Sequence, residues 1–362
     1  MSGKMPASGH RVRVRDVDVV APNFKKRLSG VTSTIVQLVP EQTKALPIAT
    51  LGPGLPDTLP RLRWWQVPGL LRRPANRPFR IWHARRNPEM LAGVVLRDIF
   101  RAPVKLVFTS ASQREHTRWT RFLIRRMDRV VATSRKTAGY LRVSSRVVLH
   151  GIDTGRFSPP SSPGEGAAAV GMASDQRYVG CFGRVRRQKG TDLFVDAMIA
   201  LLPERPGWSA IIAGQATGPH ADFEAELKER VRAAGLAERV LFVGTRTDVP
   251  DWYRALSLFI APQRWEGFGL TPLEAMATGV PVVATDVGAF SEQLEGSGAG
   301  ALVPVDDLAA MIAAAGRYMD DEVLRSTAAR AALTHARGHF PLEGEAQALN
   351  ALYAELWREA SR

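Results

Sequence analysis

Short apolar runs alternate with longer amphipathic segments along most of the chain. Runs of this length, bounded by Gly, Pro and polar residues, are typical of strands buried on both faces. Apolar residues between them recur every three or four positions, which predicts helices. The expected strands are residues 17–23, 79–84, 104–110 and 129–134, followed by 177–183, 209–214, 239–244, 256–262 and 280–285.

Strand–helix alternation predicts an α/β fold with two doubly wound parallel sheets and right-handed crossovers. A length of 362 residues suits two domains. A Pro-, Ser- and Gly-rich linker at 158–175 places them at 1–155 and 156–340. The helix expected at about 340–362 either caps the second domain or packs back on the first. Because ligands bind beyond the carboxyl ends of such strands, we expect a site in a central cleft.

The net charge of +14 is unevenly distributed. Residues 1–155 hold 29 Lys and Arg against 9 Asp and Glu, a balance of +20, whereas residues 156–362 hold 20 against 26, a balance of −6. Such asymmetry favours an anionic partner for the first domain, either nucleic acid, a membrane surface or a phosphorylated substrate. A solvated basic surface is the simpler alternative, but it predicts charge spread over both halves.

Targeting and redox signals are sparse. No apolar run approaches the ~20 residues of a membrane span, and the N-terminus lacks the apolar core of a signal peptide. We therefore expect a cytoplasmic protein. The only cysteine, Cys181, lies in the apolar run VGCFG and is expected to be a buried strand residue. Residues 53–78 are rich in Pro, Arg and Trp and predict a long surface excursion.

The stretch FGRVRRQKG follows a predicted strand and precedes a helix that Thr191 can cap. Gly183 allows the turn, and the cations Arg184 and Lys189 suit a diphosphate. A basic surface loop is an equal alternative on this stretch alone.

The stretch RWEGFGLTPLE places Glu266 and Glu274 on either side of a Gly-Phe-Gly turn. Thr271 and Glu274 match a capping box, which is a purely structural explanation for Glu274. A helix N-terminus also attracts phosphate, and capping requires neither the turn nor an acid at 266. A nucleotide-sugar uses all of these features, since its ribose and sugar hydroxyls bind carboxylates.

Together these two stretches resemble the family 4 retaining glycosyltransferases of the GT-B fold. That family carries two glutamates separated by seven residues, matched here by Glu266 and Glu274, and a G-R-x-x-x-x-K-G motif, matched from Gly183 to Gly190. The resemblance extends through HGIDTGRFSP and EAMATGVPVVATDVGAFSE and is best over residues 129–305. It implies two Rossmann-like domains that face a central cleft.

The resemblance also implies roles for individual residues. Arg184 and Lys189 would bind the donor diphosphate, Glu274 the ribose and Glu266 the transferred sugar. Members of the family need no metal or other cofactor. The remaining donor-binding positions that the resemblance implies are Gly30, Gly183, Gly267, Phe268, Gly269 and Leu270.

The first domain departs from the family pattern where relatives carry His-x-His. This chain has His83, Ala84 and Arg85. His83 is therefore either a catalytic or acceptor-binding residue or only a packed strand residue. Arg85 and Arg86 are expected to contact the acceptor.

Several stretches, among them VAPNFKKRLSGVTSTIVQL and IWHARRNPEM, more narrowly resemble bacterial lipopolysaccharide core mannosyltransferases that use GDP-mannose. A phosphorylated Kdo–lipid A acceptor explains the basic first domain. Trp64, Trp65 and Trp119, unless they belong to a core, predict peripheral contact with the inner membrane.

The expected function is retaining transfer of mannose from GDP-mannose to the lipopolysaccharide inner core. Within the fold, the alternative is a transferase that uses a UDP-sugar such as UDP-glucose. A phosphorylase is disfavoured because no pyridoxal-phosphate lysine motif is evident. A catalytically silent nucleotide-sugar binder is also possible, but it would not need both the G-R-x-x-x-x-K-G motif and the two glutamates to be complete. Nucleic-acid binding through the basic half is the distant alternative, and no known motif supports it.

Overall fold

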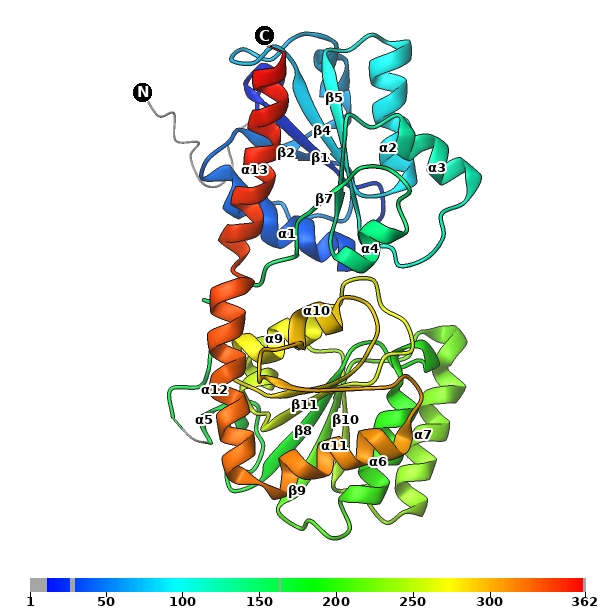
Figure 1. Ribbon diagram of the computed structural model, residues 1–362, viewed down its shortest axis with the longest axis vertical. Coiled ribbons are helices and arrows are strands. Elements are labelled where there is room, and N and C mark those ends of the chain that lie inside the picture. Colours follow the sequence, from blue (N-terminus) through cyan, green and yellow to red (C-terminus); the bar gives the residue numbers. More distant parts are fainter. Residues whose placement is uncertain (1–11, 27–29, 163, 361–362) are drawn as a thin grey trace. The chain divides into compact units, whose positions relative to one another are not determined.

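The computed structural model describes residues 12–26, 30–162 and 164–360. It divides the chain into two compact units (Figure 1). Unit 1 comprises the chain up to Gly151 together with Leu342 onward, and unit 2 is Ile152–Pro341. The extreme N-terminus and part of the KKRLSGVT loop lie outside the described residues.

Unit 1 is built on a parallel sheet in the order β3-β2-β1-β4-β5-β6-β7. The order reverses between β1 and β4, as in a doubly wound fold. The strands are β1 (Val19–Pro22), β2 (Ile48–Leu51), β3 (Arg61–Leu62), β4 (Arg80–Ala84), β5 (Val104–Ser110), β6 (Arg129–Ala132) and β7 (Arg146–Val147). The helices are α1 (Gly30–Thr43), α2 (Asn87–Val94), α3 (Arg118–Arg125), α4 (Arg135–Gly139) and α13 (Leu342–Glu359), with short helices η1 (Val14–Asp16), η2 (Trp64–Leu71) and η3 (Val95–Ile99).

Two separate cores cover the two faces of this sheet. One packs α1 and α13 against the sheet, and its largest side chains include Tyr353 and Trp357 of α13. The other packs η2, α2, η3 and α3 against the opposite face, through residues such as Leu70, Met90 and Leu123. The C-terminal helix α13 is therefore part of unit 1, although the chain enters it only after completing unit 2.

Unit 2 repeats the topology with the strand order β10-β9-β8-β11-β12-β13. Its strands are β8 (Arg177–Phe182), β9 (Trp208–Ala213), β10 (Val240–Gly244), β11 (Leu258–Ala261), β12 (Val282–Thr285) and β13 (Gly300–Val303). Its helices are α5 (Glu165–Ala169), α6 (Thr191–Leu201), α7 (Ala221–Ala233), α8 (Val249–Arg254), α9 (Thr271–Ala277), α10 (Phe290–Leu294), α11 (Leu308–Asp320) and α12 (Glu322–His339), with short helices η4 (Arg187–Lys189) and η5 (Gly218–His220). Parallel strands in both sheets confirm the predicted fold class.

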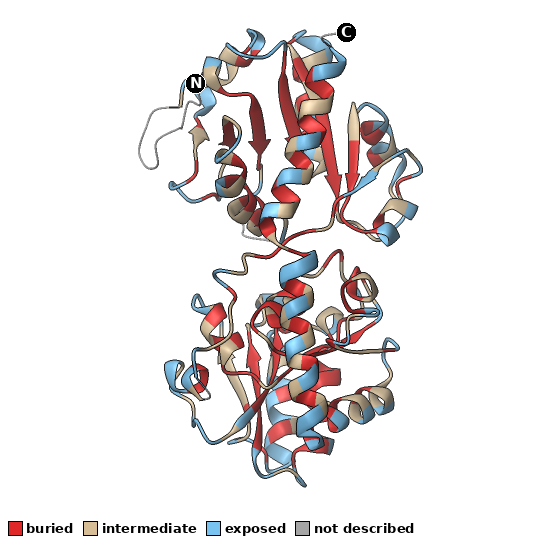
Figure 2. Ribbon diagram, turned by 60° about the vertical axis from the view of Figure 1, so that its left-hand side comes forward, coloured by how far each residue is buried: buried red, intermediate tan, exposed pale blue. Residues whose placement is uncertain are grey.

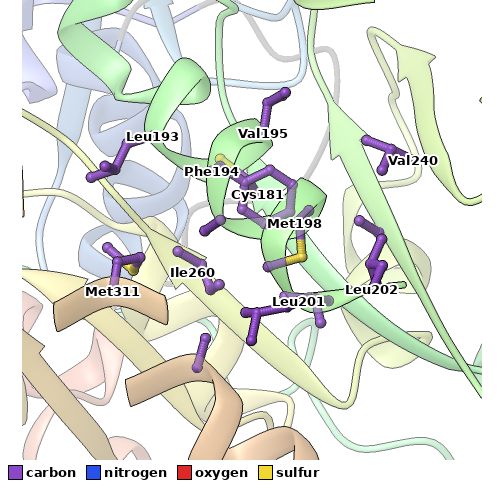
Figure 3. Packing of buried hydrophobic residues seen from close by; sticks show 14 of the residues in the cluster. Cys181, Leu193, Phe194, Val195, Met198, Leu201, Leu202, Val240, Ile260 and Met311 are labelled. Carbon is purple, nitrogen blue, oxygen red and sulfur yellow. The ribbon is translucent and has the colours of Figure 1, made fainter. Parts of the chain in front are cut away.

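The strands of both units are largely buried, whereas the covering helices expose their outer sides (Figure 2). In unit 2, Cys181 packs against Phe194 and Met198 of α6 inside an apolar cluster (Figure 3). Burial raises the pKa of the Cys181 thiol to about 12. The prediction of a buried, unreactive cysteine is confirmed.

The segment expected to be a linker is more ordered than its composition suggests. It contains α5, and a Cβ atom added at Gly166 would lie 2.2 Å from the carbonyl oxygen of Arg254 at the end of α8. Gly and Ala allow this close helix–helix approach, so the small residues of the segment serve packing as well as connection.

Candidate functional site

Two loops of unit 2 follow the neighbouring strands between which the strand order of the sheet reverses. The basic loop (residues 183–190) follows β8, and the acidic loop (residues 262–270) follows β11. Strands β8 and β11 are direct neighbours in the sheet. Because parallel strands end at the same sheet edge, their loops emerge side by side, where ligands bind in open α/β sheets.

Glycine conformation shapes the basic loop. Gly183 has φ of +139° and Gly190 has φ of +68°, both in the region that favours glycine. A Cβ atom at Gly190 would lie 1.8 Å from the carbonyl oxygen of Pro262 in the acidic loop. Gly190 is also the N-cap of α6. The prediction that Thr191 caps this helix is wrong, because the left-handed glycine already turns the chain into its first turn.

Backbone and side-chain contacts join the two loops. The Arg264 amide donates to the Gln188 carbonyl (3.0 Å), and the Arg264 guanidinium donates to the Arg187 carbonyl (2.6 Å). Lys189 forms an ion pair with Glu266, with 20% and 18% of the two side chains exposed. The structure thus brings the predicted cation and the predicted sugar-binding carboxylate together across 77 residues of sequence.

Arg184 differs from Lys189 in having no partner. Its side chain is exposed, and no ion pair or side-chain hydrogen bond is found for it within the described part of the chain. A guanidinium in this position is free to bind an anionic oxygen with paired N–H groups. Of the two cations predicted to bind the diphosphate, Lys189 is therefore paired with a carboxylate, and Arg184 is open to solvent.

Glu274 points into unit 2 and does not cap its helix. The Tyr253 hydroxyl donates to Glu274 Oε2 (2.8 Å), and burial raises the pKa of the Glu274 carboxyl. Leu270 is the N-cap of α9, without a side-chain cap, and the Thr271 hydroxyl has no hydrogen-bond partner in the described residues. The capping-box explanation is therefore wrong, which leaves Glu274 available for a ligand.

The Gly-Phe-Gly turn is held in place by α10. The Gln293 side-chain amide donates to the carbonyls of Gly269 (2.9 Å) and Phe268 (3.4 Å). Gly269 has φ of +81°, and a Cβ atom there would lie 2.2 Å from the Phe290 ring. Only glycine fits this position. The Gly267 amide donates to Glu266 Oε1 (3.0 Å), which orients the carboxylate.

In unit 1, His83 lies on β4 and is 1% exposed. Its Nδ1 is 2.5 Å from the Tyr353 hydroxyl, and its Nε2 is 2.6 Å from the Thr109 hydroxyl. Burial holds the pKa of the imidazole well below its ordinary value. The structure thus shows His83 as a neutral, packed strand residue, and its role toward a substrate stays a prediction.

Arg85 and Arg86 follow β4 at the strand-order reversal of unit 1 and differ in their environment. Arg85 is 9% exposed, and burial lowers the pKa of its guanidinium. Arg86 donates to Asn23 Oδ1 (2.7 Å), the Thr32 hydroxyl (3.0 Å) and Glu89 Oε1 (2.9 Å).

Arg86 therefore joins polar groups from α1, α2 and the loop after β1. Gly30, the other predicted site residue of this unit, is exposed at the start of α1. The acceptor-binding assignments of Arg85 and Arg86 stay predictions.

No metal site is evident. Among the residues that the structure describes, no group of three or more His, Cys, Asp or Glu side chains is arranged to hold a metal ion. Lys189 is the cation that pairs with Glu266, and Arg156 is the cation whose charge acts on Glu274. Metal independence stays a prediction.

Comparison with known proteins identifies the family. Residues 176–321 match the family model described as glycosyl transferases group 1. The chain is 61% identical to the lipopolysaccharide core biosynthesis mannosyltransferase LpsB of Rhizobium meliloti, over 96% of this chain and 100% of LpsB. It is 52% identical to LpcC, which bears the same description, of Rhizobium leguminosarum bv. viciae, over 95% of this chain and 97% of LpcC. The chain belongs to the group 1 glycosyltransferases.

Solved structures of glycosyltransferases agree with this fold. Anabaena HepE in complex with UDP and glucose has a TM-score of 0.78 with 18% identity, over 93% of this chain and 99% of HepE. The C-terminal domain of LpcC from Francisella tularensis is 32% identical with a TM-score of 0.51, over 53% of this chain and 99% of that domain. The chain is thus a glycosyltransferase with two Rossmann-like units of the GT-B class.

Two residues of this glycosyltransferase site were not predicted from sequence. Tyr253 lies in α8, which was not predicted from the sequence, and Gln293 directly follows the quoted stretch EAMATGVPVVATDVGAFSE. Neither position carries a signal for its contact, because Tyr253 and Gln293 meet the acidic loop and α9 only in the folded unit.

Replacing Glu274 with glutamine is expected to stabilise the protein at neutral pH and to weaken nucleotide binding. The folded protein holds the Glu274 proton more tightly than the unfolded chain, so ionisation of this buried carboxyl lowers stability as pH rises above its ordinary pKa. Glutamine removes that penalty and still accepts from Tyr253. Thermal unfolding should show Tm higher by about 2–4 °C at neutral pH, the shift produced by ~1 kcal/mol in a domain of this size.

The gain in Tm should disappear when the pH is lowered below the ordinary pKa of a glutamate carboxyl, where the wild-type side chain is protonated in both states. Calorimetric titration with GDP should show weaker binding in the same variant. Unchanged GDP affinity would contradict the ribose-binding role of Glu274, whatever happens to Tm.

Proposed function

We propose that this glycosyltransferase moves mannose from GDP-mannose to the inner core of lipopolysaccharide, in its Kdo–lipid A region. The observation that carries the proposal is the 61% identity with LpsB over 96% of the chain, because that extent includes unit 1 as well as the donor motifs of unit 2. A UDP-sugar donor is the alternative within the same fold.

The geometry of unit 2 suits departure of a nucleotide diphosphate. Arg184 and Lys189 would bind the diphosphate oxygens and stabilise the charge that develops on them. Glu266 would hold the transferred sugar, and Glu274 the ribose hydroxyls. As the bond between the anomeric carbon and the phosphate oxygen breaks, the acceptor oxygen attacks the same face, and its proton passes to a phosphate oxygen. The anomeric configuration is then retained without an enzymic nucleophile.

The proposed acceptor is an anionic glycolipid, which places the reaction at the cytoplasmic side of the inner membrane. A balance of +20 over residues 1–155 supports this electrostatically. In the described part of the chain, no helix has the length and apolarity of a membrane span. We therefore propose peripheral association with that membrane, with nucleic acid excluded as a partner.

Incubation of the protein with Kdo–lipid A and one donor at a time tests this proposal. GDP-mannose is expected to support transfer, whereas UDP-glucose and UDP-N-acetylglucosamine are not. Mass spectrometry of the glycolipid measures the added hexose. Because the proposed cations replace a metal, excess EDTA should leave the rate unchanged. Transfer from a UDP-sugar alone would overturn the mannosyl assignment, and loss of activity in EDTA that Mg²⁺ restores would overturn metal independence.

A further inference from the structure

The two helical layers of unit 1 differ in what they show to solvent. The helices η2, α2, η3 and α3, with the residues that directly follow them, cover the second core. We call them the aromatic layer. The opposite layer consists of α1 and α13. Of the twelve large apolar side chains exposed among the described residues, eight lie in the aromatic layer and none lies in α1 or α13. These eight are Trp64, Trp65, Leu71, Leu91, Ile99, Phe100, Trp119 and Phe122.

The exposed side chains in the aromatic layer are large and grouped. Trp65 is 65% and Ile99 70% exposed. On α3, the rings of Trp119 and Phe122 stack with centroids 5.7 Å apart, and both remain half exposed. Helix α3 lies beside α2 and η3, where Asn87 donates to the Thr120 hydroxyl (2.8 Å) and Arg97 donates to the Arg126 carbonyl (2.8 Å). Apolar exposure on this scale indicates an interaction surface.

Charge follows the same division. The segments of the aromatic layer, residues 63–73, 87–101 and 117–126, contain nine arginines and two acidic residues. Both acids are engaged, since Glu89 is buried against Arg86, and Asp98 binds Arg97 and Arg126. Helices α1 and α13 together contain five glutamates and one arginine. The face that exposes aromatic rings is therefore basic. The opposite face has no such excess of cations, and its glutamates are largely paired, as Glu355 is with Arg146.

Several of these arginines form no ion pair with any described residue. Arg118 and Arg125 flank the stacked rings of α3 and form no ion pair, and the same holds for Arg63, Arg72 and Arg73 around η2. Unpaired cations beside exposed Trp and Phe suit an interface in which rings enter the headgroup region and guanidinium groups meet lipid phosphates.

We propose that the aromatic layer of unit 1 is a docking surface for an anionic lipid bilayer, with α3 as one of its anchors. The proposal rests on the proposed function in one respect, which is that the acceptor is itself embedded in such a bilayer. It assigns the contact to η2, α2, η3 and α3 and not to α1 and α13, which expose none of the large apolar side chains and carry no excess of cations. Arginines and aromatic rings alone would also suit single-stranded nucleic acid. The exposed aliphatic side chains Leu71, Leu91 and Ile99 favour the bilayer, because they offer no ring on which a base can stack.

Flotation of the full-length protein with vesicles tests the surface. Mixed phosphatidylcholine–phosphatidylglycerol vesicles are expected to bind the protein in a salt-sensitive way, and phosphatidylcholine vesicles much less. An arginine at an anionic surface contributes about 1 kcal/mol, so the double variant Arg118→Ala/Arg125→Ala should lower partitioning about 30-fold. Trp119→Ala/Phe122→Ala should lower it by a comparable factor. Both pairs are exposed, so Tm should stay unchanged.

Matched control variants remove exposed arginines and exposed apolar side chains that lie outside the aromatic layer. Arg330→Ala/Arg337→Ala deletes two exposed arginines of α12, and Val147→Ala/Val323→Ala trims two exposed apolar side chains outside the aromatic layer. Both control variants should partition within twofold of the wild type. The proposal would be wrong if the controls lost as much binding as the α3 variants, or if the α3 variants bound vesicles like the wild type. Binding to an oligonucleotide but not to vesicles would also contradict it.

A second readout separates this inference from the proposed function. Transfer from GDP-mannose to a de-acylated, water-soluble Kdo-containing acceptor should be equal in the α3 variants and the wild type, whereas transfer to Kdo–lipid A in vesicles should be slower in the variants. If the wild type fails with the soluble acceptor, the proposed function is wrong, and vesicle binding still decides the docking surface. Equal rates on vesicles would contradict a role of the surface in presenting the acceptor.

Discussion

Replacing Lys189 with alanine is expected to lower the turnover number by about 10²–10³-fold, the loss seen when one preorganised charge-stabilising group is removed. Lys189 is the cation that the fold places against Glu266, between the two loops at the centre of unit 2. Without it, the charge that develops on the departing diphosphate is stabilised by Arg184 alone. A radiolabelled transfer assay under saturating donor measures the effect on kcat.

Arg187→Ala is the matched control for this variant, because it removes a cation from the same loop. Its guanidinium pairs with Asp192 and Glu226 and lies over the Phe223 ring. We expect a change in kcat of no more than a few fold. Lys189 is partly exposed, so Tm of the alanine variant should remain close to that of the wild type. Wild-type turnover in Lys189→Ala would refute the diphosphate role.

The second large effect is expected for Glu266→Gln, which should lower transfer by about 10²-fold while GDP binds as well as before or more tightly. A hydrogen bond to a carboxylate contributes about 1.5–3 kcal/mol, against about 0.5–1.5 kcal/mol for one to a neutral amide. Loss of this difference at two sugar hydroxyls, one for each carboxylate oxygen, corresponds to the expected factor of about 10². In the ligand-free protein the same carboxylate neutralises Lys189. Glutamine releases that lysine for the diphosphate, and its oxygen still accepts from the Gly267 amide.

Transfer kinetics and calorimetric titration with GDP separate these two effects. Glu226→Gln is a suitable control, since it changes an exposed carboxylate of the same unit that pairs with Arg230. It should alter neither quantity. If Glu266→Gln lost GDP affinity in proportion to its activity, the residue would be supporting the loops and not the transferred sugar.

Burial separates the predicted strands from the missed ones only in part, since β10 is mostly half-buried and was predicted, whereas β2 is buried throughout and was missed. Residues 104–110, expected as a strand from their apolar run, match β5 to the residue. The strands that were missed are β2, β3, β7 and β13. Two of these, β3 and β7, have two residues each and lie at the sheet edges, where neither length nor burial produces a pattern. In β13, three of the four residues are only partly buried.

Local capping rules failed at both helices of the candidate site. Thr191 and Thr271 satisfy the sequence requirements of an N-cap, yet Gly190 and Leu270 occupy those positions. In each case the preceding loop is fixed by contacts with a distant segment. Gly190 packs against Pro262, and Gly269 packs against Phe290. Tertiary packing therefore set the start of each helix, against the preference of the isolated sequence.

The sequence by itself determined the α/β class, the two motifs with their spacing, and the charge difference between the two halves. Each of these can be recognised from residues that are close in sequence, because strand burial, helix period and motif spacing are local properties of the chain. Right-handed crossovers then imply that the motifs emerge at one sheet edge.

Only the tertiary structure decided which groups meet there. The ion pair between Lys189 and Glu266 and the hydrogen bond from Tyr253 to Glu274 join segments that periodicity treats separately. It also decided that the exposed aromatic residues of unit 1 share one layer, because η2, α2, η3 and α3 pack on the same face of the sheet. Which distant residue a side chain contacts depends on the strand order and on the direction of the crossovers. The alternation of apolar and polar residues determines neither the strand order nor the crossover direction.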